Sequence, residues 1–496
     1  MNVSLETLVQ LCILLPIFST IGIVALRGNQ NSREAVSVFA SLVVFYSVVS
    51  IYLGLQSGET IAVHWLQILP GLSLSFSVEP LGMIFALVAS FLWLVTIIYA
   101  IGYMRGHNED NQTRFFCCFS IAIGSVMGVA FADNLLTLFI FYEVLTLSTY
   151  PLVTHSGTEA AKKAGRVYLG ILLSTSIAFF LFAILGTWVI AGTLDFTQGG
   201  VFPADANTTL LGVILVLFIF GIGKAAIMPF HRWLPAAMVA PTPVSALLHA
   251  VAVVKAGVFT IMKVCTLIFG IDLLAILPTT QGLVYVAGAT VLLASFIAMR
   301  QDNLKARLAY STIGQLAYIT IGALLASSLG VVGGSMHIAM HAFGKITLFF
   351  CAGAILVAAH KSKVSELDGL GKQMPITMVA FFIASLSIIG IPPAGGSWSK
   401  WYLLVGSIDT GQWTILVILL LSSLLNIAYL LPIPIRAFIF KESTTNGAVG
   451  IKEAPLPCLI AIGITTLGCI ALFIYPDPLY DLASSILQTS SVAYGQ

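Results

Sequence analysis

The sequence predicts an all-α polytopic membrane protein with about fourteen transmembrane helices. Its 496 residues are 58% hydrophobic and only 8% charged, whereas a soluble domain carries about 25% charged residues. Apolar runs of about 20 residues, long enough to span a bilayer, recur along the whole chain. The basic residues also alternate between connections in the way that such a series of helices requires.

The predicted helices are joined by connections too short to form a soluble domain. The first segment is not expected to be a cleavable signal peptide, because its flank MNVSLE has no Lys or Arg. In order, the fourteen apolar segments cover residues 5–26, 35–55, 81–101, 114–132, 134–153, 166–191, 208–228, 242–268, 281–299, 308–327, 330–359, 375–406, 413–435 and 456–475.

The distribution of charge tests this count, because the segments were chosen by hydropathy alone. An N-terminus on the outer side leaves no basic residue in the outer connections, which carry acids such as Glu59, Glu79, Asp195, Asp205, Asp272 and Asp409. The inner connections hold Arg27, Arg33, Arg105, Arg114, Lys162, Lys163, Arg166, Arg232, Arg300, Lys305, Arg307, Lys361, Lys363, Lys372, Arg436, Lys441 and Lys452. This agreement with the positive-inside rule predicts that both termini lie on the outer side.

The remaining basic residues fall inside apolar segments. Lys263 lies toward the end of its segment, so we expect its side chain to reach the interface. Deeper positions, where a lysine costs roughly 2.5–3.5 kcal/mol on insertion scales, hold Lys224, Lys255, Lys345 and Lys400. The other deep titratable residues are Glu143, His249, His337 and His341. Ionisable groups at this depth indicate a functional route.

Two of these lysines stand beside signals that interrupt a helix. In GIGKAAIMPF, Lys224 precedes Pro229, and in GIPPAGGSWSK, Lys400 follows Pro392, Pro393, Gly395 and Gly396. A proline removes a helical hydrogen bond, and irregular backbone at membrane depth is tolerated only where protein or water surrounds it. The seventh and twelfth helices are therefore predicted to be broken.

The two breaks lie five helices apart, which predicts a repeat of five helices. Helices 4–8 would form one copy and helices 9–13 the other, inverted because five is odd. The predicted units are residues 1–113 with helices 1–3, 114–268 and 269–436 with the two half-channels, and 437–496 with helix 14 and the C-terminal tail.

The deep residues have the chemistry of a proton relay. His337, His341 and Lys345 share one face of the eleventh helix, at spacings of four residues. One lysine could be a structural partner of Glu143, but a single carboxylate cannot neutralise four deep lysines. Burial and neighbouring charges shift such groups between protonation states. The predicted relay comprises Glu143, Lys224, His249, Lys255, His337, His341, Lys345 and Lys400.

The other local motifs favour simpler interpretations. HRWLP, residues 231–235, is expected to be an interfacial loop with a tryptophan anchor. Tyr310, Ser311 and Gln315 are more typical of helix packing than of a conduit. The seven cysteines lack metal-ligand spacing, and Lys345 would repel a cation from the nearby histidine pair. We expect no metal, no cofactor, no catalytic residue and no nucleic-acid partner.

Helices 4–13 contain the stretches FYEVLTLSTYPLV, GKAAIMPFHRWLPAAMVAPTPVSALLHAVAVVKAGVF, ARLAYSTIGQLAYI, MHAFGKITLFF and GIPPAGGSWSKWYL. They resemble the antiporter-like subunits shared by the complex I membrane arm, the Mrp-type cation/proton antiporters and the membrane-bound hydrogenases, and the D-type Mrp antiporter subunits are the most similar. The resemblance implies two inverted half-channels joined by a central line of polar residues. It also implies that Glu143 pairs with Lys224 and that Lys400 is the terminal residue, with central-axis positions at His249, Lys255, His341 and Lys345.

The predicted function is that of a proton-translocating subunit in a multisubunit monovalent cation (Na⁺)/proton antiporter of the cytoplasmic membrane. Its expected partners are other membrane subunits, the lipid bilayer and protons, with any route for sodium ions formed mainly by the other subunits. One alternative is a proton-pumping subunit of an NADH-quinone oxidoreductase or membrane-bound hydrogenase, itself without a redox or hydrolytic site. A stand-alone solute transporter is less favoured, because the deep groups are nearly all basic and are spread over several helices.

Overall fold

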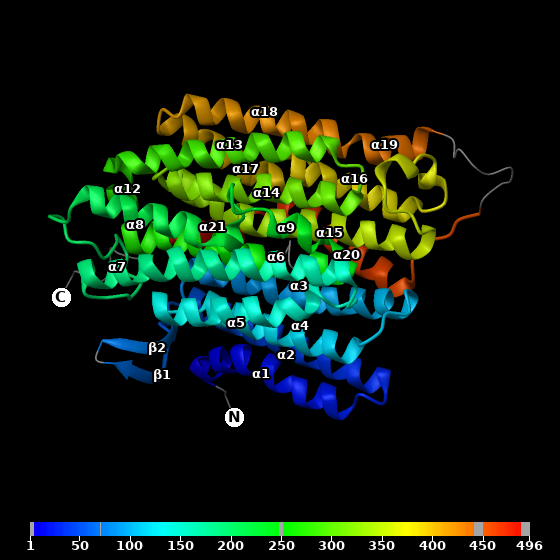
Figure 1. The fold of residues 1–496 in the computed structure, drawn as a ribbon, viewed down its shortest axis with the longest axis horizontal. Coiled ribbons are helices and arrows are strands. Elements are labelled where there is room, and N and C mark those ends of the chain that lie inside the picture. Colours follow the sequence, from blue (N-terminus) through cyan, green and yellow to red (C-terminus); the bar gives the residue numbers. More distant parts are fainter. Residues whose placement is uncertain (1–3, 70, 248–250, 441–449, 488–496) are drawn as a thin grey trace.

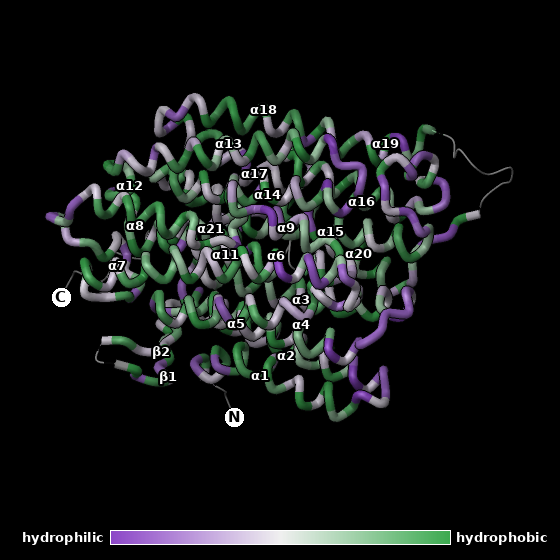
Figure 2. The backbone as a smooth tube through the Cα atoms, viewed as in Figure 1, coloured by the Kyte–Doolittle hydropathy of each residue, from purple (hydrophilic) through white to green (hydrophobic). Residues whose placement is uncertain are grey.

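Long helices dominate the computed structural model, which describes residues 4–69, 71–247, 251–440 and 450–487. These helices lie roughly side by side along one direction, from α1 at one edge of the molecule to α18 at the other (Figure 1). Figure 2 shows hydrophobic residues along the helices, whereas hydrophilic residues gather mainly in the connections at the two ends. This distribution suits a protein whose sides face lipid.

The chain begins with α1 (Leu5–Ala25), α2 (Gln30–Gln56) and α3 (Pro80–Gly106). The next helices are α4 (Gln112–Ala130), α5 (Leu135–Val153), α6 (Glu159–Thr175), α7 (Leu181–Ala191), α8 (Thr208–Gly221), α9 (Trp233–Ala236), α10 (Thr242–Ala246), α11 (Val253–Lys263) and α12 (Ile271–Ile276). The chain continues with α13 (Pro278–Arg300), α14 (Leu304–Leu324), α15 (Ser328–Ala359), α16 (Pro375–Ile389), α17 (Gly396–Asp409), α18 (Trp413–Leu430), α19 (Pro432–Ile439), α20 (Leu456–Ile474) and α21 (Asp477–Ser485).

Each predicted apolar segment contains helix, which confirms the polytopic helical fold. Within the described residues, ten helical spans are long and apolar enough to cross a membrane, and α8 and α16 are shorter apolar helices. The count of fourteen stays a prediction, because three of the predicted segments are not continuous helices.

One connection departs from the all-α prediction. The strands β1 (Ala62–Leu69) and β2 (Leu72–Ser77) form an antiparallel hairpin between α2 and α3. Phe76 is fully buried, and its ring centroid lies 4.6 Å from that of Trp65 and 5.6 Å from that of Phe141 on α5. Hydropathy selects long apolar runs, so it passes over a short segment in which polar and apolar residues alternate.

The seventh predicted helix is broken beside Lys224. Helix α8 ends at Gly221, and a 3₁₀ turn follows at Gly223–Ala225. Trp233 in α9 is completely buried, and its Nε1 donates a 3.0 Å hydrogen bond to the Gly223 carbonyl. The expectation of an interfacial tryptophan in HRWLP is therefore wrong, because the indole instead satisfies a carbonyl within the break.

The twelfth predicted helix is broken in the same way. Helix α16 ends at Ile389 and α17 begins at Gly396, so Pro392 and Pro393 lie in the connection between them. Trp398 follows this break, and its Nε1 donates a 3.0 Å hydrogen bond to the Phe473 carbonyl of α20. Each break is thus accompanied by an indole that bonds to a backbone carbonyl.

The eighth predicted segment is also discontinuous. Helix α10 ends at Ala246 and α11 begins at Val253, while a π-helical turn, Val264–Phe269, follows α11. His249 lies outside the described residues. The segment was expected to be one helix because no proline stands inside it after its first turn.

Lys263 does not reach the interface as expected. Its side chain is completely buried, and Nζ lies 2.7 Å from Glu79 Oε1 at the start of α3. The same Nζ donates a 2.5 Å hydrogen bond to the Ala132 carbonyl and lies 4.2 Å from the centroid of the Phe196 ring. The Glu79 carboxylate therefore takes the place of the water that the Lys263 ammonium would contact if its side chain reached the interface.

The buried ion pair of Glu79 with Lys263 is expected to stabilise the folded protein. Glu79→Gln leaves the Lys263 ammonium without its carboxylate, and removing one partner of a buried pair costs about 3–5 kcal/mol. We expect a lower melting temperature in detergent, with much of the loss recovered in the double variant Glu79→Leu/Lys263→Met. The control is Glu159→Gln, which removes an exposed pair with Lys162 that is worth about 0–1 kcal/mol. Equal melting temperatures for Glu79→Gln and the control would contradict this assignment.

Candidate functional site

Among the described residues, the deep lysines and histidines of the predicted relay are enclosed by protein rather than exposed on the sides of the bundle. Their exposed fractions lie between 0% and 5% for the six residues Lys224, Lys255, His337, His341, Lys345 and Lys400. Each ammonium or imidazole must therefore find its hydrogen-bond partners within the chain or from trapped water.

Lys224 is held against α5. Its Nζ donates hydrogen bonds to the Tyr142 carbonyl at 2.8 Å and to Thr146 Oγ1 at 2.6 Å. The ammonium also lies 3.1 Å from the centroid of the Tyr142 ring, where the electron-rich face attracts a cation. The backbone of the break packs closely on α11, because a Cβ at Gly257 would collide with Lys224 and Ala225.

Glu143 follows Tyr142 directly, yet its carboxylate does not contact the Lys224 ammonium. Both carboxylate oxygens are buried and have no hydrogen-bond partner among the described residues. The pairing that the resemblance implies is therefore not a formed ion pair in this structure. Because Lys224 binds its neighbours on α5 through neutral oxygens, forming the pair requires its side chain to exchange these acceptors for Glu143.

Lys255 and His341 form the central contact of the site. Lys255 Nζ on α11 lies 2.5 Å from His341 Nδ1 on α15. An ammonium can donate only to a ring nitrogen that carries no proton. Transfer of the shared proton would leave a neutral amine beside an imidazolium, which is one step of a relay.

His337 lies one turn before His341 on the same helix. The ring centroids of the two histidines are 5.7 Å apart. His337 Nδ1 lies 2.8 Å from Ser399 Oγ on α17, and its Nε2 lies 3.1 Å from Gln315 Oε1 on α14. The imidazole thus connects α14, α15 and the helix that carries Lys400.

Lys345 extends the polar series toward α18. Its Nζ donates a 2.6 Å hydrogen bond to Ser311 Oγ on α14. Tyr429 OH donates to the same hydroxyl at 2.8 Å and also contacts Asn426 Oδ1. Ser311 and Gln315 were expected to be polar groups that hold helices together. The structure places Ser311 against Lys345 and Gln315 against His337.

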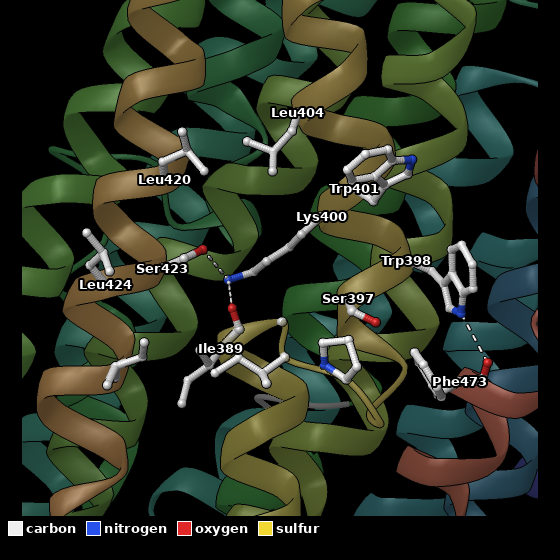
Figure 3. Close-up of a pocket in the computed structure, with 14 residues that line it drawn as sticks. Ile389, Ser397, Trp398, Lys400, Trp401, Leu404, Leu420, Ser423, Leu424 and Phe473 are labelled. Carbon is white, nitrogen blue, oxygen red and sulfur yellow. Dashed lines mark hydrogen bonds between the residues drawn. The ribbon is translucent and has the colours of Figure 1, made fainter.

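Lys400 lies beside the second break. Its Nζ donates to the Ile389 carbonyl at 3.0 Å and to Ser423 Oγ at 3.2 Å (Figure 3). The same Nζ lies 4.7 Å from the centroid of the Tyr318 ring. The surrounding cavity of about 730 Å³ has largely apolar walls, which include Leu404, Leu420 and Leu424. A lysine side chain thus reaches a helix end through an otherwise apolar pocket.

Several contact residues were not identified from the sequence. Tyr142 faces Lys224, and Tyr318 and Ser423 contact Lys400. Tyr429 bonds to Ser311, the acceptor of Lys345, and Asn426 bonds to Tyr429. Asn426 and Tyr429 stand three residues apart on α18, a spacing that places them on one face. That spacing was a usable signal, but hydroxyl and amide groups are common in membrane helices as packing groups.

Two family models match the chain. The model described as "NADH:quinone oxidoreductase/Mrp antiporter, TM" matches residues 132–426. The model described as "NADH-Ubiquinone oxidoreductase (complex I), chain 5 N-terminus" matches residues 65–116.

The individual relatives include subunits of NADH-quinone oxidoreductases and a subunit of a probable cation/proton antiporter. The chain is 29% identical to the N subunit of NADH-quinone oxidoreductase from Desulforudis audaxviator, over 84% of this chain and 85% of the relative. It is 33% identical to the A/B subunit of a probable K⁺/H⁺ antiporter from Rhizobium meliloti, over 82% of this chain but 40% of the relative. It is 29% identical to the L subunit of NADH-quinone oxidoreductase from Escherichia coli, over 80% of this chain and 63% of the relative.

Two solved structures share the fold. A chain in the Mrp complex from Dietzia sp. DQ12-45-1b matches with a TM-score of 0.87 at 22% identity, over 98% of this chain and 97% of that one. A chain in the membrane-bound sulfane sulfur reductase, an archaeal respiratory membrane complex, matches with a TM-score of 0.84 at 23% identity, over 97% of both chains. Together with the first family model, which covers more than half of the 496 residues, these matches confirm the resemblance, and the chain belongs to the NADH:quinone oxidoreductase/Mrp antiporter membrane family.

Proposed function

We propose that this chain is a proton-translocating subunit of a multisubunit monovalent cation/proton antiporter. The observation that carries the proposal is the buried contact of Lys255 with His341, which lies between further enclosed lysines and histidines on neighbouring helices. The relay residues are Glu143, Lys224, His249, Lys255, His337, His341, Lys345 and Lys400. Protons move along such a series when each base accepts one proton and releases another, directly or through bridging water.

The chemistry of the contacts supports protons rather than sodium as the ion that this chain carries. Sodium is a hard cation that prefers several oxygen ligands at once. A fixed sodium ion near Lys224 or Lys345 would meet a positive charge, and two such charges 4 Å apart repel by about 4 kcal/mol at an effective dielectric of 20. Any sodium or potassium route would then be formed mainly by other subunits.

Two half-channels would share this relay. We assign residues 114–268 to the first and 269–436 to an inverted second copy, with residues 1–113 and 437–496 flanking them. The breaks beside Lys224 and Lys400 occupy corresponding places in the two copies, which supports the repeat.

We place the protein in the cytoplasmic membrane with both termini on the outer side, as the basic residues of the connections indicate. Its partners would be the other membrane subunits of a hetero-oligomeric complex. The names of the relatives support such an assembly, because they are subunits of antiporters and of quinone oxidoreductases.

A second candidate function is proton pumping in the membrane arm of a redox complex. It is favoured by the relative from Desulforudis audaxviator, of which this chain covers 85%. The two functions differ in what drives transport. In vesicles that hold the assembled complex, a sodium or potassium gradient moves protons through an antiporter, whereas a redox pump needs an electron donor and acceptor.

Glu143→Ala tests the first half-channel. The substitution removes the one carboxylate for which Lys224 could exchange its neutral acceptors, so we expect cation-driven proton movement to fall to near background while the complex still assembles. Proton movement would be followed with a pH-sensitive dye in vesicles that hold the assembled complex, and Glu159→Gln is the control. Wild-type rates in Glu143→Ala would remove Glu143 from the relay.

Lys400 tests the end of the relay. Lys400→Ala removes the titratable group from its cavity and should abolish coupled proton movement, whereas Lys400→Glu should retain part of it because a carboxylate also carries a proton. The same vesicle measurement compares the two variants. An ordered sodium ion coordinated wholly by this chain near Lys224 or Lys345 would refute the assignment of protons.

A further inference from the structure

A second cluster of titratable groups lies outside the relay, where the connection after α3 meets the connection after α5. His107 Nδ1 lies 3.0 Å from Glu109 Oε1, and His155 Nε2 lies 3.9 Å from Glu109 Oε2. The side chains of His107, Glu109 and His155 are 38%, 18% and 2% exposed, respectively. We call these three residues the His–Glu cluster; it runs from an accessible imidazole to a buried one through a shared carboxylate.

The groups around the cluster have mixed charge. Arg114 on α4 donates a 2.8 Å hydrogen bond to the His155 carbonyl, and Lys305 on α14 donates a 2.6 Å hydrogen bond to the Ala240 carbonyl. Asp110, Arg114, Tyr103 and Lys305 are the other titratable groups that interact with the cluster. Burial lowers the pKa of His155, and Arg114 lowers it further, whereas Glu109 and Asp110 act to raise it. His155 is therefore neutral near pH 7 and binds a proton as the pH falls.

The cluster continues inward through hydroxyl groups. The His107 ring stacks on Tyr103 of α3 with centroids 5.7 Å apart, and the hydroxyls of Tyr103 and Thr242 lie 3.4 Å apart. Thr242 begins α10 and is completely buried. One turn later, the buried hydroxyl of Ser245 has no hydrogen-bond partner among the described residues. An unsatisfied buried hydroxyl costs free energy unless it bonds to water or takes part in proton transfer.

The Thr242 side chain also lies against α15, the helix that carries His341 and Lys345. A Cβ at Gly353 on α15 would collide with Tyr99 OH and with the Thr242 side chain. Gly353 stands about two turns beyond Lys345 on the same helix. On the other side, α10 leads along the chain toward α11, which carries Lys255. The path from the His–Glu cluster therefore reaches α15, which holds His341, and α10, which precedes the Lys255 helix in the chain.

We propose that the His–Glu cluster is a proton-exchange site, through which the aqueous phase at this end of the molecule exchanges protons with the relay by way of Tyr103 and Thr242. Each hydroxyl on the way releases one proton as it accepts another, so no charge is left on it, and water bridges the gaps longer than a hydrogen bond. This inference rests on the proposed function, because an exchange site has a use only if the relay moves protons.

Glu109→Gln and His155→Gln test the site in the assembled complex reconstituted in vesicles. A group that takes up protons from water limits the transport rate when protons are scarce. In both variants we therefore expect the alkaline limb of the rate–pH profile to shift by about one pH unit toward acidic pH. The rate at acidic pH should stay near that of the wild type, because abundant protons reach Thr242 through water. The matched control is Glu159→Gln, which changes an exposed carboxylate near the same end without touching the cluster.

Variants of Thr242 provide a second, independent test of the exchange site, which can be used if the Glu109 and His155 variants do not assemble. Thr242→Val keeps the shape but removes the hydroxyl, so we expect about a tenfold loss of transport at alkaline pH, while Thr242→Ser retains the wild-type profile. Wild-type profiles in Thr242→Val and in every cluster variant that assembles would overturn the proposal. Lys255→Ala separates the two hypotheses: persistent transport in that variant defeats the proposed function itself, whereas its loss together with unchanged cluster profiles defeats only the exchange site.

Discussion

The burial of ammonium groups inside an apolar bundle is the constraint on which the rest of the structure depends. An ammonium has three donors and no acceptor, and leaving it unsatisfied in a low dielectric is costly. Here the acceptors come from hydroxyls, backbone carbonyls, one imidazole and aromatic faces on helices distant in sequence. Each contact fixes the position of a helix, so the arrangement of α5, α11, α14, α15 and α18 follows from the needs of a few lysines as well as from apolar packing.

The helix breaks belong to the same constraint. A helix end leaves carbonyls without intrahelical partners, and Lys400 uses one of these, the carbonyl of Ile389. At the first break, Trp233 and the Ala226 N–H donate to the Gly223 carbonyl, while Lys224 reaches across to α5. A break in the membrane interior is tolerated where its carbonyls receive donors, as those of Gly223 and Ile389 do. In return, the break brings polar backbone close to a buried lysine.

The buried lysines fall into two classes that differ in their partners. Lys263 is closed against Glu79 in a direct ion pair near the β hairpin, which suits a fixed structural contact. The lysines of the proposed relay have neutral partners in this structure. A carboxylate in direct contact favours the charged form of a lysine, so neutral partners keep the two protonation states closer in free energy, as repeated proton transfer requires.

The sequence by itself determined the membrane class, the deep position of the relay lysines and the helix breaks beside Lys224 and Lys400, but not the break between α10 and α11. Hydropathy, proline chemistry and the cost of a buried charge are local properties, readable along one segment. Only the tertiary structure decided the partner of each charged group. Lys345 meets Ser311 across 34 residues and Lys255 meets His341 across 86, and Lys263 meets Glu79 rather than water. Helical periodicity says which residues share a face, but the packing of one helix on another decides what that face touches.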